Sequence, residues 1–575
     1  MPLTAPTTPP GLPASLDYPE VPAGSILAAG AARWGDRTAF AHDGHHLTFA
    51  DTYRAACRFA NALRERGIGR GDVVALHLPN CLAFPIAYYG TLLAGATFSP
   101  ANPLLPPDDL AFQLTDCEAA AVVTFGPVAG ALASVADRIP ARFTVVVQPA
   151  GNLPEGATEF EAFHAAQPET PPAVDLDLHE DLAHLAYTGG TTGRSKGVRL
   201  SHRNVVVNTL QHACWGTGSV PALDAHGDVV IDQIGSEDEW PSRLGTGVAI
   251  NLTPWFHAMG IIGGLNAAVI AGTTVVLHTR FDPAAYVADA ERLRVTGIGG
   301  APALFAALLA TPSFHTADLS SVRAIGSGAA PMNHAMINAL RLRFPDVVVT
   351  EGYGLTEATM GAVISPTYRS GTRKVGSVGL PIFDTEVKIV PAEGGEDPLP
   401  PGEKGEVCLR GPQIMPGYRN RPEETAAALV NGWLHTGDIG ILDADGYLSI
   451  VDRKKDMLLY KGYNVFPREL EELLIAMPGV AAAAVVGRPD PEVGELPVAF
   501  VVPRGSLDAD ALMAALNEKV LPYKRLREVR VVEQIPVSAA GKVLKRELRQ
   551  QLIGDLDQLD PDAPNAPLGR LGREI

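Results

Sequence analysis

A short segment rich in glycine and threonine, residues 187–197 (Y-T-G-G-T-T-G-R-S-K-G), is the most informative feature of this chain. Its glycines allow backbone N–H groups to approach an anion closely, while the threonine hydroxyls and Lys196 add donors and positive charge. The segment is not a Walker A loop, because that motif would need glycine at Ser195 and a hydroxyl residue at Gly197. It predicts a polyphosphate-binding loop of another type.

Two other interpretations compete for the same residues. Residues 193–197, G-R-S-K-G, formally match the G-x-S-x-G nucleophile elbow of α/β-hydrolases. However, Ser195 follows a Thr-Gly run and not a strand that leads straight into its turn, and no H-G-G-G-type oxyanion segment occurs in the chain. The second alternative is a mobile surface loop rich in small residues. The further motifs described below count against a mobile surface loop.

Helical patterns alternate with Val/Ile/Leu runs along most of the chain, which is typical of α/β layering. Residues 51–67 predict an amphipathic helix closed by glycine, and residues 73–78 predict the strand after it. Residues 261–277 are the most apolar stretch, but they are too short and too polar to span a bilayer. We expect a buried helix followed by a strand there.

Length, charge and cysteine content bound the class of protein. A chain of 575 residues exceeds what one hydrophobic core usually serves, so two or more domains are expected. The net charge of −18 argues against nucleic acid or an anionic membrane surface as the principal partner. The five cysteines are scattered and lack C-x-x-C spacing, which predicts neither a disulfide framework nor a zinc site.

The location and assembly state are constrained only loosely. No Lys or Arg precedes Arg33, which argues against a basic signal or transit peptide. Together with the unpaired cysteines, this predicts a cytoplasmic protein without a transmembrane segment. Peripheral membrane contact, and the choice between a monomer and a homodimer, stay open.

Nine collinear motifs give the chain a family resemblance. Behind the loop comes H-R-N at residues 202–204, and further motifs follow in order: P-W-F-H (254–257), G-S-G-A-A-P (326–331), G-Y-G-L-T-E (352–357), G-E-V-C-L-R-G-P (405–412), G-W-L-H-T-G-D (432–438), D-R-K-K-D (452–456), K-G-Y-N-V (461–465) and P-V-S-A-A-G-K (536–542). From about residue 25 to about residue 552 the chain resembles the adenylate-forming superfamily. This superfamily includes acyl- and aryl-CoA synthetases, firefly luciferase and peptide-synthetase adenylation domains.

The resemblance implies an α/β fold with a large N-terminal α/β domain of several subdomains and a small, mobile C-terminal α/β lid. We expect a flexible N-terminus over residues 1–24, an AMP-binding domain over 25–454, a lid domain over 455–552 and a flexible tail over 553–575. Lys455 is the expected hinge residue. Residues 216–247, acidic around Trp240, are expected to form an exposed loop, and a lid over the acyl pocket is the alternative.

The chemistry of an acyl-adenylate explains why such residues are needed. A carboxylate must approach the α-phosphorus of ATP although both are anionic, so the site must neutralise charge and hold the groups in line. The resemblance implies that Glu357 binds Mg²⁺ and that Asp438 and Arg453 bind the ribose. It places the phosphates on Thr188, Gly189, Gly190, Thr191, Thr192, Gly193 and Lys196, and the adenine and α-phosphate on Gly328, Ala329, Ala330, Gly352, Tyr353, Gly354 and Thr356.

The resemblance also assigns residues to the two half-reactions. Lys542 is expected to contact the carboxylate and the α-phosphate as charge builds in the transition state. His257 is expected to gate the acid site and not to act as an obligate base. After adenylation the lid is expected to rotate and bring Lys461, Gly462 and Tyr463 to coenzyme A.

The acid is predicted from the side chains at expected pocket positions. Small or aliphatic residues there indicate an apolar slot without an internal charge for an amino group, and these are Ala258, Gly260, Ile261, Gly264, Gly326, Ala358, Met360 and Val363. A medium- or long-chain fatty acid is favoured, and an aryl or arylpropenoic acid is the alternative. An enzyme that loads a carrier protein and a luciferase-like oxygenase are the other functional classes. The K-G-Y-N motif counts against the carrier-protein loader.

Overall fold

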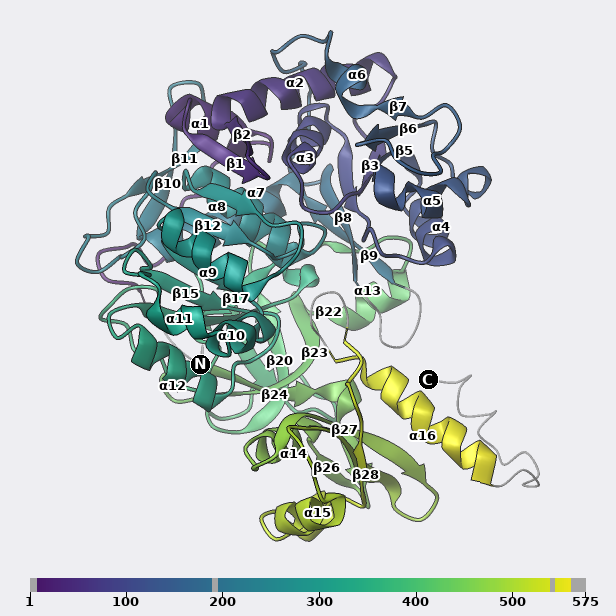
Figure 1. The fold of residues 1–575 in the computed structure, drawn as a ribbon. Helices are drawn as coiled ribbons and strands as arrows, with labels where there is room; N and C mark the ends of the chain where they lie inside the picture. Colours follow the sequence, from purple (N-terminus) through teal and green to yellow (C-terminus); the bar gives the residue numbers. More distant parts are fainter. Residues whose placement is uncertain (1–7, 189–194, 538–542, 560–575) are drawn as a thin grey trace. The chain divides into compact units, whose positions relative to one another are not determined.

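The computed structural model describes residues 8–188, 195–537 and 543–559 (Figure 1). The chain divides into two compact units. The N-terminal unit extends to Thr436 and includes Ile441–Ser449, and the C-terminal unit comprises Gly437–Gly440 and the chain from Ile450 onwards. Both units combine helices with sheets, which confirms the predicted α/β class. The division after Ser449 falls slightly before the domain boundary expected at residue 454.

The first sheet of the N-terminal unit carries the phosphate-loop segment. Its centre is the V-V-A-L-H strand, whose five residues are all buried, as expected for a parallel strand covered on both faces. In order, the strands are β21 (Gly417–Tyr418), β9 (Lys196–Ser201), β8 (Leu182–Thr188), β4 (Thr97–Pro100), β3 (Val73–His77), β5 (Ala119–Phe125), β6 (Phe143–Val147) and β7 (Thr158–Glu159).

The second sheet has a parallel centre and antiparallel edges. In order, its strands are β18 (Leu380–Pro381), β17 (Gly361–Ile364), β16 (Val348–Gly354), β15 (Ala324–Ser327), β14 (Gly297–Gly300), β12 (Val248–Asn251), β13 (Thr274–Leu277), β1 (Thr38–His42) and β2 (His45–Thr48). A buried apolar cluster joins its strands to α9 (Pro283–Arg292), α10 (Pro302–Leu309) and α12 (His334–Arg343). Because β14, β15 and β16 run parallel, their carboxyl ends meet at one edge, where open α/β sheets bind ligands.

Capping boxes define where the two longest helices of the N-terminal unit begin. Thr48 and Asp51 cap α2 (Phe49–Glu65), and Ser201 and Asn204 cap α7 (His202–Thr217). The predicted helix at 51–67 is therefore confirmed. The other helical elements are α1 (Ser25–Trp34), α3 (Ala83–Leu93), α4 (Pro107–Asp116), η1 (Gly126–Val128), α5 (Ala129–Ala133), η2 (Ala136–Arg138), α6 (Phe160–His164), η3 (Met259–Asn266), α8 (Ala267–Ile270), α11 (Pro312–Thr316), η4 (Thr356–Ala358) and α13 (Pro422–Ala428).

The acidic segment at 216–247 is not the exposed loop that we expected. It forms a hairpin of β10 (Ser219–Leu223) and β11 (Val229–Gln233), and Trp240 behind it is fully buried. The indole packs on Gly218 and Gly235, where a Cβ would clash with the ring, and lies 5.5 Å from the Tyr368 ring. A buried tryptophan anchors the segment, while Asp232, Glu237 and Asp238 are exposed.

The start of the chain also differs from the flexible segment expected at 1–24. Residues 8–24 pack on the N-terminal unit, with Leu12, Leu16 and Val21 buried. The Tyr18 hydroxyl donates a hydrogen bond to Asp384 at 2.6 Å. Scattered apolar side chains between the prolines supply this packing, which a composition argument does not detect.

A third sheet of the N-terminal unit lies near the division between the two units in the sequence. Its strands are β19 (Glu386–Val390), β20 (Lys404–Arg410), β23 (Trp433–Leu442) and β22 (Leu429–Val430), and β24 (Leu448–Arg453) pairs with β23. Strands β23 and β24 carry the chain from one unit into the other.

The C-terminal unit is a small α/β domain with its own core. Its sheet runs β26 (Tyr463–Val465), β25 (Leu458–Tyr460), β28 (Gly494–Pro503) and β27 (Val480–Asp490), and β29 (Glu528–Val531) pairs with β28. Its helical elements are η5 (Lys454–Asp456), α14 (Pro467–Ile475), α15 (Ala509–Asn517), η6 (Pro522–Lys524) and α16 (Lys545–Leu559). Pro467 opens α14, where its fixed φ suits the first helical turn. The predicted tail from 553 instead continues α16 to Leu559. Within the described ranges, no helix has the length and apolarity to cross a membrane.

Candidate active site

The phosphate-loop segment is presented by an antiparallel hairpin. Strands β8 and β9 pair so that Thr188 lies opposite Lys196. Five of the predicted phosphate contacts lie outside the described residues, namely Gly189, Gly190, Thr191, Thr192 and Gly193. Ser195 leads directly into the strand that begins at Lys196. This is the reverse of a nucleophile elbow, in which a strand precedes the serine and a helix follows it.

Tyr418, which the sequence interpretation did not single out, joins Lys196 to Glu357. It lies on β21, where it pairs with Val198 of β9. Its hydroxyl donates a hydrogen bond to Glu357 Oε1 at 2.9 Å, and the Lys196 ammonium lies 5.0 Å from the centre of its ring. Burial and the neighbouring carboxylate raise the pKa of Tyr418 well above its usual value. The hydroxyl therefore stays protonated as a donor.

Glu357 is held in place by its backbone as well as by its side chain. It lies in η4, and its carbonyl oxygen accepts a hydrogen bond from the Met415 N–H at 2.8 Å. Across the ranges that the structure describes, no group of three or more His, Cys, Asp or Glu could hold a metal ion. Mg²⁺ is usually bound through one or two carboxylates together with substrate phosphates. The single carboxylate of Glu357, held in one orientation, therefore fits a Mg²⁺ ion whose other ligands include the phosphates of a nucleotide.

The predicted adenine residues lie at the carboxyl ends of two adjacent strands. Strands β15 and β16 are parallel, with Ser327 opposite Glu351, so residues 328–330 and 352–354 follow at the same edge. Ala329 has a positive φ of 67° in this turn. At Gly354 a Cβ would lie 1.7 Å from the Met360 carbonyl oxygen, so this position requires glycine. The structure thus brings the two nucleotide motifs together.

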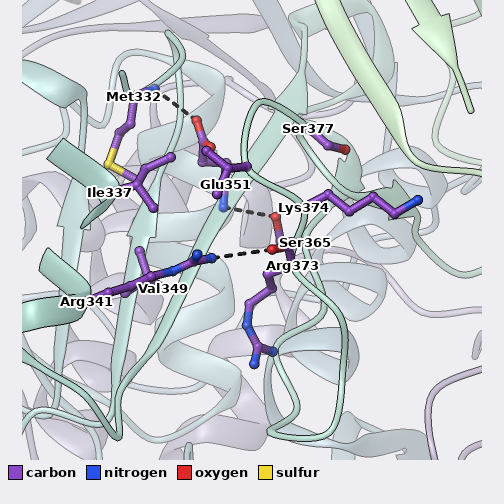
Figure 2. A pocket seen from close by; sticks show the side chains of 10 residues that line it. Met332, Ile337, Arg341, Val349, Glu351, Ser365, Arg373, Lys374 and Ser377 are labelled. Carbon is purple, nitrogen blue, oxygen red and sulfur yellow. Dashed lines mark hydrogen bonds between the residues drawn. The ribbon is translucent and has the colours of Figure 1, made fainter. Parts of the chain in front are cut away.

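A small cavity lies next to β16, and hydrogen bonds among the residues that line it help to hold this edge of the sheet (Figure 2). Its volume is about 10 Å³, roughly the space of one water molecule, so it cannot admit a nucleotide. Glu351 accepts a hydrogen bond from the Met332 N–H at 2.9 Å, and its own N–H donates to Ser365 Oγ at 3.2 Å. Arg341 donates to the Arg373 carbonyl oxygen at 3.4 Å. These contacts hold the strand that carries Gly352, Tyr353 and Gly354.

His257 stands in the loop before η3 with its side chain unpaired. Its ring lies 4.8 Å from the Phe256 ring, and Nε2 is buried without a hydrogen-bond partner among the described residues. Burial lowers the pKa of His257, so the imidazole is neutral at neutral pH. Its gating role stays a prediction.

The predicted acid slot has a more polar wall than we expected. Element η3 is a π-helix, a form that is rare and often found at functional sites. A methyl group added at Gly263 would lie 3.6 Å from Met360 Cε and 3.6 Å from Nε2 of His212 on α7. The sequence interpretation missed His212. Of the predicted slot residues, Ala358 and Val363 are fully buried.

Asp438 and Arg453, the predicted ribose pair, lie close together in the C-terminal unit. Arg453 Nε is 3.6 Å from Asp438 Oδ1, and the two residues come from adjacent strands β23 and β24. The predicted hinge residue Lys455 follows in the short turn η5. Burial and the neighbouring Arg453 lower the pKa of Lys455. Lys542, the predicted adenylation lysine, lies outside the described residues.

The predicted coenzyme A residues form a tight hairpin. Lys461 and Gly462 connect β25 to β26 with φ values of 50° and 80°, the left-handed pair that a two-residue type I′ turn requires. Around Gly462 a Cβ would meet no atom within 4 Å. Tyr463 is 59% exposed and stacks on Tyr523, with ring centres 4.8 Å apart. Tyr523 is a third residue that the sequence interpretation missed.

Comparison with known proteins decides the family. Residues 27–419 match the AMP-binding enzyme family, and residues 469–542 match the AMP-binding enzyme C-terminal domain. The chain belongs to the adenylate-forming acyl-CoA synthetase superfamily. It shares the fold of this superfamily, a large N-terminal α/β domain and a small C-terminal domain.

Several members of the superfamily are similar over nearly their whole length. A feruloyl-CoA synthase of Amycolatopsis sp is 36% identical over 519 residues, which cover 89% of this chain and 96% of that protein. A long-chain-fatty-acid–CoA ligase of Bacillus subtilis (strain 168) is 33% identical over 568 residues, with 94% and 96% covered. The crystal structure of an anthranilate CoA ligase in complex with anthranoyl-AMP has a TM-score of 0.81 at 26% identity, with 95% and 99% covered.

Proposed function

We propose that this enzyme is an ATP-dependent acid–CoA ligase that releases AMP. In the first step an acid carboxylate oxygen attacks the α-phosphorus of ATP, and pyrophosphate leaves. In the second step the thiol of coenzyme A attacks the acyl carbonyl carbon, and AMP leaves with the bonding electrons. The observation that carries this proposal is the contact chain from Lys196 through Tyr418 to Glu357 at the base of the phosphate hairpin.

The predicted site residues have distinct roles in the proposal. Lys196 and the loop backbone neutralise the β- and γ-phosphates, and Glu357 holds the Mg²⁺ that accompanies the nucleotide. The edge formed by β15 and β16 receives the adenine, and Asp438 with Arg453 receives the ribose. Lys542 stabilises the charge that develops during adenylation. The hairpin at Lys461 serves the thioester step.

For the acid, we propose a body that is mainly apolar. The favoured class is a medium- or long-chain fatty acid, as in the relative from Bacillus subtilis. The alternative is an arylpropenoic acid. It is supported by the 36% identity to a feruloyl-CoA synthase.

We also propose a cytoplasmic location. All five cysteines are buried and free. Free thiols fit a reducing compartment, where structural disulfides are rare.

Product analysis tests the proposed reaction. With ATP, Mg²⁺ and acids from acetate to palmitate, with cinnamate and benzoate included, we expect acyl-AMP and pyrophosphate without coenzyme A. Addition of coenzyme A should then give acyl-CoA and AMP. Formation of ADP and phosphate would show that the chain does not adenylate its acid. Acyl transfer only to a carrier protein would support a carrier-loading function.

A further inference from the structure

His212 borders the predicted acid slot from the side of α7. A methyl group at Gly263 would lie 3.6 Å from its Nε2, and a methyl group at Gly361 would lie 4.0 Å from its Nδ1. Met360 Cε is equally close to the Gly263 position. The imidazole therefore stands where η3, α7 and the residues after the G-Y-G-L-T-E motif converge.

Part of the hydrogen-bonding capacity of His212 is unused. Its Nδ1 is buried and has no hydrogen-bond partner within the described ranges. Other buried histidines have one ring nitrogen paired, although the second nitrogen of His77 and of His202 is also unpaired among the described residues. His77 contacts Thr124 Oγ1 at 2.8 Å, His184 contacts the Tyr88 hydroxyl at 2.8 Å, and His202 Nδ1 accepts a hydrogen bond from a backbone N–H. A buried polar group without a partner destabilises the protein, so an unpaired imidazole at this place indicates a missing ligand group.

The protonation state of His212 defines which ligand group fits. Burial lowers the pKa of His212 to about 4, so the ring is neutral at physiological pH. A neutral imidazole has one N–H donor and one acceptor nitrogen. A neutral ring offers no opposite charge to a carboxylate or an ammonium on the ligand. A hydroxyl group, which both donates and accepts, matches the ring.

Trp255 adds a second unused donor near the same helix. Its Nε1–H is buried without a partner among the described residues, and it lies 3.6 Å from the Cβ position of Gly264. The indole is otherwise packed among aromatic rings, with the Phe84 ring centre 5.4 Å away. The Gly263 and Gly264 positions of η3 therefore each lie near polar side-chain atoms, although the residues of η3 itself are mainly apolar.

We propose that His212 determines acid specificity by binding a hydroxyl group on the body of the acid, so that the preferred substrate is a hydroxylated acid. This inference rests on the proposed acid–CoA ligase function. The hydroxyl belongs either to a phenolic arylpropenoic acid or to a hydroxylated fatty acid. An acid without it leaves the imidazole unpaired, which costs about ten- to a hundredfold in discrimination.

Matched acid pairs test the inference in the full-length enzyme. The pairs are 4-hydroxycinnamate with cinnamate and 16-hydroxypalmitate with palmitate, and the measurement is kcat/KM for pyrophosphate release. The wild type should prefer the hydroxylated member of one pair about tenfold or more, and that pair identifies the class of acid. His212→Leu should reduce this ratio about ten- to a hundredfold. His212→Gln, similar in size and able to donate and accept, should retain much of the preference.

The ratio separates specificity from general damage, because both members of a pair report on the same folded enzyme. Equal turnover of both members by the wild type would overturn the inference, as would an unchanged ratio in His212→Leu. Such results with pyrophosphate release intact would leave the acid–CoA ligase proposal standing. No pyrophosphate release with any acid of the wider screen would overturn that proposal and this inference together.

Discussion

Replacing Tyr418 by phenylalanine tests whether the contact between Lys196 and Glu357 supports adenylation. The substitution removes the hydroxyl that donates to Glu357 Oε1 at 2.9 Å but keeps the ring beneath the Lys196 ammonium. A hydrogen bond to a charged group contributes about 1.5–3 kcal/mol. The side chains of Tyr418 and Glu357 are only partly buried, so the lower end of this free-energy range applies. It corresponds to about a tenfold loss of activity.

The loss should be seen in acyl-AMP formation, measured as pyrophosphate release during an Mg²⁺ titration. Without the tyrosine hydroxyl the Glu357 carboxylate is free to rotate, so half-maximal activity should need a higher Mg²⁺ concentration. Tyr187→Phe is the matched control. Tyr187 lies on the same β8–β9 hairpin, and its hydroxyl also donates a hydrogen bond to a carboxylate, that of Asp116, at 2.6 Å. If Tyr418→Phe and the control had the same Mg²⁺ dependence as the wild type, the proposed positioning of Glu357 would be refuted.

Three further predictions address the lid, the slot and stability. Lys542→Ala should reduce acyl-AMP formation by a factor of about 10²–10³ and spare thioester formation from supplied acyl-AMP. Lys455→Pro should instead impair mainly the thioester step. Equal losses in both steps for each variant would argue against a rotating lid. Leucine at Gly264 or at Gly326 should shorten the longest acid accepted, since overpacking costs about 1–3 kcal/mol, and an unchanged chain-length profile would place both residues outside the slot. Burial lowers the pKa of His202 to about 4, below the unfolded value near 6.5, so the unfolded chain takes up its proton first and stability falls as the pH falls through this range. Denaturant unfolding at pH 7 and at pH 5 measures how much the free energy of unfolding decreases on acidification. This decrease should be about 2 kcal/mol smaller in His202→Gln than in the wild type, and an identical pH dependence in the two proteins would contradict this assignment.

The sequence predicted features that depend on local patterns, and it missed contacts between distant segments. The helix that begins at Phe49 and the buried strand at Val73 follow from periodicity and end signals. Tyr418 lies about sixty residues after Glu357, and in a single sequence nothing marks it as the partner of that glutamate. Its role depends on the pairing of β21 with β9, which is a property of the tertiary fold.

His212 shows the same limit for the substrate slot. Its position in the middle of a helix suggests an ordinary core residue, and only the packing of α7 against η3 reveals that it borders the predicted slot with its Nδ1 unpaired among the described residues. The segment at 216–247 was misjudged for the opposite reason. Its many carboxylates suggested an exposed loop, whereas the single indole of Trp240 anchors the whole hairpin.

The way in which lysines are held explains how an acidic chain can bind anionic substrates. Lys374 forms ion pairs with carboxylates, so much of its charge is neutralised locally. Lys196 and Lys461 instead lie over the rings of Tyr418 and Tyr460, at 5.0 and 6.0 Å, and neither forms an ion pair with another described residue. A cation–π contact orients an ammonium without cancelling its charge. The two lysines predicted to face phosphate and coenzyme A therefore keep their full charge available, although the net charge of the chain is −18.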